Sequence, residues 1–341
     1  MPSEPVVPLL SIRDLCVAFR TERGLVRAVE GVSLEVSAGE VLGLVGESGS
    51  GKTQTLLSVL GLILDPNAEI SGSVRLEGEE LVGMPQKRLR RIRGKRAAMI
   101  FQDPMTALTP VHTVGAQIVE QIRAHTKLSA KAAREKAEGL LSEVGIPDPK
   151  RVFDRYPHQL SGGMRQRIVI AMAVSCEPKL IVADEPTTAL DVTVQAQILD
   201  LINRLRRDHG TAVVFVTHDL GVVSEIADKV AVMYAGRIVE SGPLGALFSA
   251  PRHPYTHGLF NSIPPLRGPR PERLTGIPGL PPSSGAPMEG CAFAPRCRYR
   301  FEPCAQRPPL VLDGAQEVAC FLPDAAKRGF RREDGEGGIA A

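Results

Sequence analysis

The sequence predicts an α/β fold followed by a proline-rich extension. In the first 250 residues, short apolar β-rich runs alternate with longer amphipathic stretches, the rhythm of strands connected by helices. Only 13 of the 28 prolines fall there, and the other 15 fall in the last 91 residues. Because proline removes a backbone donor and restricts the residue before it, we expect a domain boundary near residue 250.

The expected strands form two groups. An early group, with the look of a hairpin or antiparallel sheet, comprises residues 11–19, 29–36 and 72–76. A second group alternates with helical stretches and predicts the main sheet, at residues 41–45, 97–101, 180–183, 212–217 and 230–234.

The predicted organisation has three parts. Residues 9–250 are the α/β domain, and residues 251–323 are an ordered extension of loops and short strands. Residues 324–341 are expected to be disordered, because they are polar and glycine-rich without periodicity.

Composition excludes several classes of protein. The 341 residues are 43% hydrophobic and 23% charged, average values for a soluble globular chain, and the net charge is only +3. No apolar run reaches about 18 residues, and the N-terminus lacks the pattern of a signal peptide, so we expect a cytosolic chain. The run Lys87–Arg96 has seven cations in ten residues but no interleaved aromatics. We expect a solvated helix face there, and no nucleic-acid partner.

Residues 46–53, GESGSGKT, fit the pattern GxxxxGK followed by Ser or Thr, between an apolar strand and a helix. Glycines let successive backbone N–H groups surround a β-phosphate, and the helix N-terminus adds partial positive charge. Lys52 reaches the β- and γ-phosphates and Thr53 can ligate Mg²⁺. The sequence therefore predicts a nucleoside triphosphate site made of Gly46, Ser48, Gly49, Ser50, Gly51, Lys52 and Thr53.

Two carboxylates end the apolar strand at residues 180–183. Asp184 can hold Mg²⁺ through water, and Glu185 can orient or deprotonate an attacking water. Taken alone, Asp-Glu after a strand is an ordinary helix N-cap. Combined with the phosphate loop, it favours nucleotide hydrolysis.

A third motif, LSGGMRQR at residues 160–167, resembles the signature of the ATP-binding-cassette (ABC) ATPases. Ser161, Gly162 and Gly163 open a helix, so their donors and the helix dipole offer a second phosphate clamp. The resemblance implies that this clamp binds ATP held by the opposite subunit. It also implies a P-loop ABC nucleotide-binding domain, with a mixed-sheet core, an antiparallel β subdomain and a helical signature subdomain.

Other positions acquire roles through this resemblance. Gln102 is similar to the glutamine that senses Mg²⁺ and the lytic water, and Asp191 to the residue that crosses the dimer interface. His218 is similar to the histidine that contacts the γ-phosphate. Phe19 is a candidate for the aromatic residue that stacks on adenine, although core packing explains it equally well.

The extension holds four of the six cysteines, Cys291, Cys297, Cys304 and Cys320. Four thiolates at one place suit a structural zinc ion or an iron–sulfur cluster. Together with the segments HPYTHGLFNSIP and CAFAPRCRYRFEPC, they make residues 9–323 resemble ATP-binding subunits of oligopeptide and dipeptide importers. Similar subunits carry a 4Fe–4S cluster there, so we favour that cluster over zinc, since the gaps lack the CxxC spacing of zinc sites. The other two, Cys16 and Cys176, stand among apolar residues, and we expect both to be buried.

The resemblance implies a transport ATPase on the cytoplasmic face of the membrane. Two cassettes would close head to tail on ATP and drive two separate permease subunits, with an extracytoplasmic solute-binding protein in the same system. The second cassette would be an identical copy or a paralogue. The alternative is an ABC ATPase acting on DNA or ribosomes, which predicts duplicated cassettes or a coiled-coil insertion. An exporter ATPase would lack the carboxy-terminal block.

Overall fold

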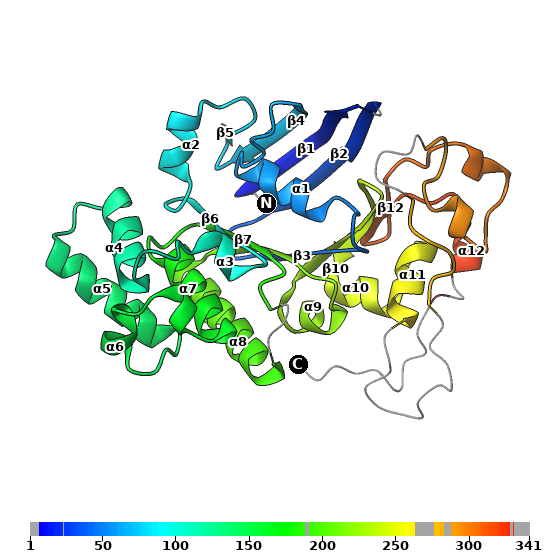
Figure 1. Ribbon diagram of the computed structural model, residues 1–341. Helices are drawn as coiled ribbons and strands as arrows, with labels where there is room; N and C mark the ends of the chain where they lie inside the picture. The colour runs from blue at the N-terminus through cyan, green and yellow to red at the C-terminus, as the bar shows by residue number, and fades with distance from the viewer. Residues whose placement is uncertain are drawn as a thin grey trace, which may run out of the picture. The chain divides into compact units, whose positions relative to one another are not determined.

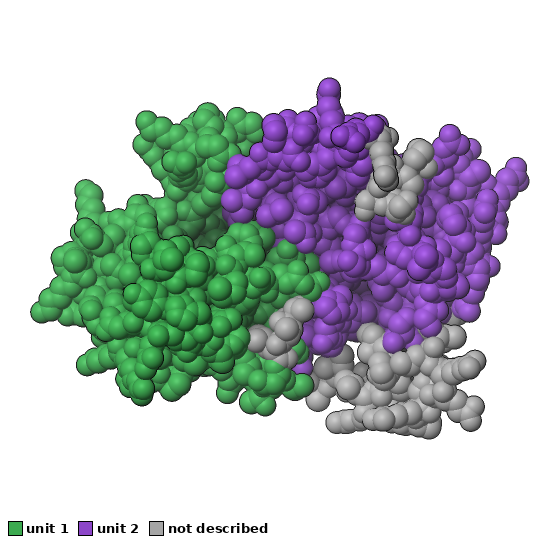
Figure 2. Space-filling view, in the orientation of Figure 1, with its two compact units in different colours: residues 1–10, 35–41, 75–216 green, residues 11–34, 42–74, 217–341 purple. Residues whose placement is uncertain are grey.

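The computed structural model describes residues 7–22, 24–187, 191–262, 276–282, 288–327 and 330. The chain divides into two compact units, coloured separately in Figure 2. Unit 1 contains residues 1–10, 35–41 and 75–216, and unit 2 contains residues 11–34, 42–74 and 217–341. Unit 2 therefore contains both the phosphate loop and the extension.

Unit 1 contains three parallel strands, β6 (Ala97–Ile100), β7 (Leu180–Asp184) and β8 (Ala212–Val216). In register, Ala97 is opposite Leu180, which is opposite Ala212. All residues of β7 and β8 are buried. This explains why these strands read as continuous apolar runs rather than as alternating ones.

The helices of unit 1 follow one another along the middle of the chain (Figure 1). Most begin at a side chain that caps the first turn, such as Thr113 before α4 and Ser129 before α5. They are α2 (Gln86–Ile92), α3 (Pro104–Ala107), α4 (Val114–His125), α5 (Ala130–Glu143), α6 (Pro149–Phe153), the 3-10 turn η1 (Pro157–Gln159), α7 (Gly162–Val174) and α8 (Val192–His209). Helix α7 contacts α3, α4 and α5, so the signature motif begins the helix that these others surround.

The early strands form a second sheet. Strands β1 (Leu10–Thr21), β2 (Gly24–Val36) and β4 (Ala68–Leu76) neighbour one another in the order β2-β1-β4. The end of β4 pairs antiparallel with β5 (Glu79–Glu80).

The main sheet in unit 2 has the order β3-β9-β10-β12-β11. Strand β3 (Val41–Val45) runs parallel to β9 (Lys229–Tyr234), and the remaining pairs, through β10 (Arg237–Pro243), β12 (Gln316–Val318) and β11 (Val311–Asp313), are antiparallel. Because Glu240 is paired with Val318, the extension contributes strands to the same sheet as the phosphate loop.

Short helices complete unit 2. They are α1 (Lys52–Val59), α9 (Leu220–Ile226), α10 (Leu244–Ser249), α11 (Pro254–Asn261), α12 (Asp324–Lys327) and the 3-10 turns η2 (Ala294–Arg296) and η3 (Glu302–Ala305). Helix α11 begins with Pro254 in its first turn, where the missing N–H costs nothing, and stops before the next prolines.

Every expected strand is present, within a few residues of the expected bounds. The expected disorder of 324–341 is wrong at its start, because α12 forms there and Phe330 is 1% exposed. Residues 328–329 and 331–341 lie outside the described part of the chain.

The basic run does form an exposed helix face, because Lys87, Arg88, Arg90 and Arg91 of α2 are exposed while Leu89 and Ile92 are buried. Arg88 pairs with Glu79, and Arg96 pairs with Glu77 and Glu79. One smaller expectation needs correction, since Cys16 and Cys176 are half-buried rather than buried. In the described ranges, none of the helices has the length and apolar character needed to cross a bilayer.

Candidate functional site

The phosphate loop connects β3 to α1 and closes around its own lysine. Lys52 Nζ donates to the carbonyl oxygens of Gly46 at 2.8 Å and Glu47 at 2.9 Å, and to Ser50 Oγ at 3.3 Å. Lys52 is only 6% exposed. The loop therefore holds the positively charged Lys52 ammonium group, which can attract a triphosphate.

Two of the loop's glycines are required by backbone geometry. Gly46 has φ +153, and a Cβ there would lie 2.1 Å from Met233 O. Gly51 has φ +101, and a Cβ would lie 2.4 Å from Ala28 O. A side chain at either position would collide with backbone that cannot move cheaply, so the loop can form only with glycine there.

The other predicted nucleotide residues of unit 2 are open to a ligand to different degrees. Ser48, Gly49 and Thr53 are exposed in the loop, and His218 is exposed beyond β8. Phe19 on β1 is half-buried, which leaves part of its ring surface available for stacking.

In unit 1, the predicted catalytic carboxylates lie at the end of β7. Asp184 is 6% exposed, and the backbone N–H of Glu185 donates to Val216 O at 2.9 Å. Gln102 Nε2 donates to Glu185 Oε2 at 3.0 Å, although the two residues are 83 positions apart. Glu185 has φ +46, an unfavourable conformation for a residue with a side chain. Such strain is concentrated at functional sites, where surrounding structure enforces it.

The signature motif begins α7 with an exposed end. Ser161 is the N-cap, and its side chain accepts from Met164 N at 3.3 Å. A Cβ added at Gly162 would meet nothing within 4 Å, and one at Gly163 would lie 3.5 Å from the Val194 side chain. The first turn is therefore accessible to a ligand from outside.

The segment after Glu185 is described only in part. Thr188, Ala189 and Leu190 lie outside the described residues. Asp191 is exposed and caps α8, accepting from Val194 N at 2.9 Å. Its expected role across a dimer interface stays a prediction.

The predicted nucleotide residues are divided between the two units. Lys52, Thr53 and His218 belong to unit 2, whereas Gln102, Asp184, Glu185 and Ser161 belong to unit 1.

All four carboxy-terminal cysteines line one pocket of unit 2, with His253, Phe293 and Phe301 also in its wall. The cysteine block, as we call residues 288–322, is closed on itself: Cys291 N donates to Cys304 O at 3.0 Å. Burial raises the pKa of the thiols of Cys291, Cys297 and Cys320, that of Cys320 to about 11. These thiols are therefore protonated at neutral pH unless a metal displaces the proton.

The pocket lined by the four cysteines offers the donor type of a thiolate-bound metal and has little free space. Cysteine thiolates are the ligands of zinc and iron–sulfur sites. Its volume is only about 10 Å³, the space of one water molecule. Among the described residues, no three His, Cys, Asp or Glu side chains are grouped so as to hold a metal ion. The expected 4Fe–4S cluster, and zinc as its alternative, stay predictions.

Two residues that contact the phosphate loop were not predicted from the sequence. Arg296 forms an ion pair with Glu47, and the Tyr255 hydroxyl accepts from Glu47 N. They lie in the segments HPYT and CAFAPRC. The sequence signal for Arg296 is a single charged residue between two cysteines, and its burial is seen only in the structure.

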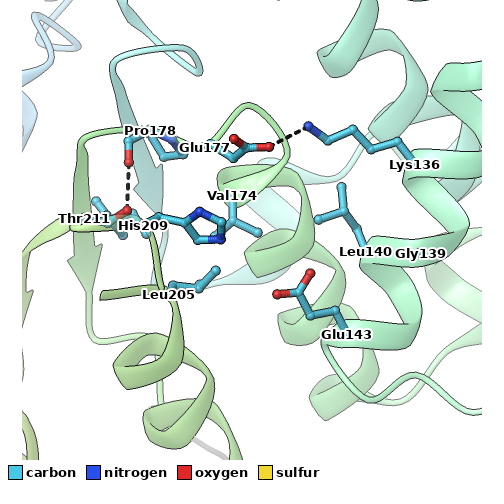
Figure 3. A pocket seen from close by; sticks show the side chains of 11 residues that line it. Lys136, Gly139, Leu140, Glu143, Val174, Glu177, Pro178, Leu205, His209 and Thr211 are labelled. Carbon is cyan, nitrogen blue, oxygen red and sulfur yellow. Dashed lines mark hydrogen bonds and ion pairs between the residues drawn. The ribbon is translucent and has the colours of Figure 1, made fainter. Parts of the chain in front are cut away.

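A larger cavity lies elsewhere in unit 1. It measures about 310 Å³ and lies between α5, the end of α8 and the segment after α7 (Figure 3). Lys136 and Glu177 form an ion pair across its edge, and His209 and Glu143 point toward it. None of the predicted nucleotide residues lines it, so it is not part of the candidate site.

Comparisons with known proteins agree with the motifs. Residues 29–188 match the ABC transporter family, and residues 239–304 match the carboxy-terminal region of oligopeptide/dipeptide transporters. A probable peptide ABC transporter ATP-binding protein of Sinorhizobium fredii is 51% identical over 94% of this chain and 97% of its own length. An oligopeptide transport ATP-binding protein, OppD, of Bacillus subtilis is 49% identical over 94% of this chain and 91% of its own.

Solved structures give the same result. A dimeric ATP-binding cassette in a post-hydrolysis state, bound to ADP and Pi, superposes with a TM-score of 0.63 at 26% identity. The superposition covers 69% of this chain and 98% of that one.

Proposed function

Since this chain belongs to the ABC ATPase family, among the ATP-binding subunits of peptide importers, we propose that it hydrolyses ATP to drive uptake of peptides or related small solutes. The loop at residues 46–53 binds the phosphates, with Lys52 moving from the loop carbonyls to the nucleotide. Phe19 stacks on adenine. Thr53, Gln102 and Asp184 would hold Mg²⁺, which shields phosphate charge when bound.

The hydrogen bond between Gln102 and Glu185 is the observation that best supports ATP hydrolysis at this site. It fixes a carboxylate at the end of β7, where the ligands of α/β sheets gather. Glu185 orients and activates the attacking water, Gln102 positions Glu185, and His218 contacts the γ-phosphate. Ser161, Gly162 and Gly163 contribute to the ATP site of a second cassette, and Asp191 lies at that interface.

The partners follow from family membership. We infer two transmembrane permease subunits, a second ABC cassette and an extracytoplasmic solute-binding protein, with this chain peripheral on the cytoplasmic face. A role on DNA or ribosomes is not favoured, because the match to the transporter carboxy-terminal region extends over residues 239–304.

Two substitutions test the assignment. Glu185→Gln keeps the hydrogen-bonding shape but removes the base, so ATPase turnover should fall about 10²–10⁴-fold while ATP still binds. Lys52→Ala removes the phosphate cation, so ATP binding itself should be lost. Near-normal turnover by purified Glu185→Gln would refute the catalytic role.

We also infer that the cysteine pocket is the place of a 4Fe–4S cluster that stabilises the extension. The supporting observation is that Cys291, Cys297, Cys304 and Cys320 all line one pocket. Protein purified anaerobically should be brown, with about four iron and four sulfide per chain. Cys297→Ser should make the extension sensitive to protease while ATP binding survives. One zinc and no iron would refute the cluster, and a metal-free, protease-resistant extension would refute any metal.

A further inference from the structure

Glu47, the second residue of the phosphate loop, is held at three points. Its backbone N–H donates to the Tyr255 hydroxyl at 2.9 Å, and its carbonyl accepts from Lys52 Nζ at 2.9 Å. Its carboxylate receives two bonds from Arg296, at 2.6 Å and 3.0 Å. Two of these partners come from the extension, more than 200 positions along the chain.

Arg296 is itself fixed in place. Its side chain is 6% exposed, and its Nε donates to Pro278 O at 2.9 Å. The hydrogen bonds to Glu47 raise the pKa of the guanidinium, which therefore stays charged. A two-pronged arginine–carboxylate pair sets direction as well as distance, so the Glu47 side chain has one preferred orientation.

A buried aromatic cluster joins both supports to the cysteine block. Ring centroids of Tyr255 lie 4.6 Å from Tyr234 and 5.4 Å from Phe293, and Phe293 also lies 5.4 Å from Tyr234. Phe293 lines the cysteine pocket, and Arg296 N donates to Phe293 O at 3.0 Å. Tyr255 and Arg296 therefore both contact Glu47 and are both linked to Phe293, Tyr255 by ring packing and Arg296 by a backbone hydrogen bond.

We propose that Arg296 and Tyr255 are positioning residues for the nucleotide, through which the cysteine block raises the affinity of the phosphate loop. They hold Glu47 so that the first turn of the loop is formed before a nucleotide arrives. The loop then loses less conformational freedom when the nucleotide binds. The affinity rises, although neither Arg296 nor Tyr255 contacts the ligand. The proposal rests on the proposed function of residues 46–53 as the phosphate site.

The rival explanation is that the ion pair between Arg296 and Glu47 only attaches the extension. In that case breaking it would loosen the cysteine block and leave nucleotide affinity unchanged. The two explanations predict different nucleotide affinities for Glu47→Gln. This substitution breaks the ion pair from the side of the loop and alters no residue of the block.

Calorimetric titration of the full chain with MgADP separates them, because ADP is not consumed. Arg296→Met and Glu47→Gln should each raise the Kd about tenfold. The double variant should be no worse than either single one, since both remove the same pair. Tyr255→Phe, which removes one hydrogen bond, should raise the Kd about threefold. In ATPase assays, KM should rise in step with Kd while kcat at saturating ATP stays unchanged.

Matched controls make the outcome decisive. Arg298→Met removes an exposed arginine from the same block and should leave the Kd unchanged. Arg296→Lys keeps the positive charge but cannot form the two parallel hydrogen bonds of the guanidinium group. It should have an intermediate Kd, and it replaces Arg296→Met if that variant does not fold. An unchanged Kd in Glu47→Gln, or effects that multiply in the double variant, would overturn the proposal. Normal binding by Lys52→Ala would instead overturn the phosphate site itself.

Discussion

The nucleotide motifs and the cysteine block differ in where their side chains find partners. Ser48, Thr53 and Ser161 are exposed. Phe293 and Arg296 are buried and are fully engaged with other parts of unit 2. Exposed motif residues are open to a ligand, whereas the block residues are bonded inside the chain. Substitutions in the first region should therefore alter binding directly. Those in the second should alter stability and, at Arg296, also the loop residue Glu47 that it bonds.

The largest expected effect is at the signature. In a Glu185→Gln background with ATP, Ser161→Arg should abolish the closed dimer, because a bulky cation replaces a donor that faces the partner's nucleotide. The measurement is the dimer fraction on gel filtration, with binding of ATP to the chain's own loop intact.

Ser129→Arg is the matched control for this change. Ser129 is also an exposed N-cap, accepting from Ala132 N at 3.2 Å, but it lies outside the signature. Its dimer fraction should stay high. If both variants dimerise equally, the signature does not contribute to a partner's site.

The next effect is in the cysteine block. Phe293 is 4% exposed and touches Tyr234 and Tyr255, so Phe293→Ala should lower the free energy of unfolding by about 3–5 kcal/mol. Phe301 lies in the wall of the same pocket with its side chain 38% exposed, so Phe301→Ala should lower the free energy of unfolding much less. Equal urea midpoints for the two variants would show that the aromatic cluster does not hold the block.

The smallest effect is a pH dependence at Glu240 in β10. Its carboxylate accepts from the backbone N–H groups of Arg252 at 2.6 Å and His253 at 2.9 Å, yet burial raises its pKa to about 7. Because the folded pKa lies above the unfolded value of 4.5, Glu240 contributes stability below pH 4.5 that is lost as the pH rises to 7.

Glu240→Gln removes that dependence. Relative to the wild type, the variant should therefore become more stable as the pH rises from about 4.5 to 7. The gain in its free energy of unfolding should be up to about 3 kcal/mol. Urea unfolding across this range measures the difference. A difference that does not change with pH would mean that the buried carboxyl is already ionised below pH 4.5.

Local pattern was enough to predict the strands and the nucleotide motifs. The turn at residues 46–53 could be recognised because its lysine bonds the carbonyl oxygens of Gly46 and Glu47, which are neighbours in sequence. The buried strand Leu180–Asp184 could likewise be recognised from its apolar run and from the two carboxyl groups after it.

Tertiary contacts were not predictable in the same way. Nothing near Glu47 in sequence indicates Arg296, 249 positions away, and nothing near Glu240 indicates a backbone turn at Arg252. The helix at Asp324–Lys327 was missed because its four residues are too few to show a helical period. Lys327 forms an ion pair there with Asp313, a partner that the sequence does not reveal.

The pairing of β10 with β12 has a practical meaning for protein engineering. The match to the transporter carboxy-terminal region begins at residue 239, inside β10, rather than at the proline-rich boundary near 250. Removing the chain after 250 would strip β12 from β10 and leave unpaired backbone groups along a buried strand, a template for aggregation. Chimeras that exchange extensions between related cassettes should therefore be joined before Arg237, so that the strand and its partner travel together.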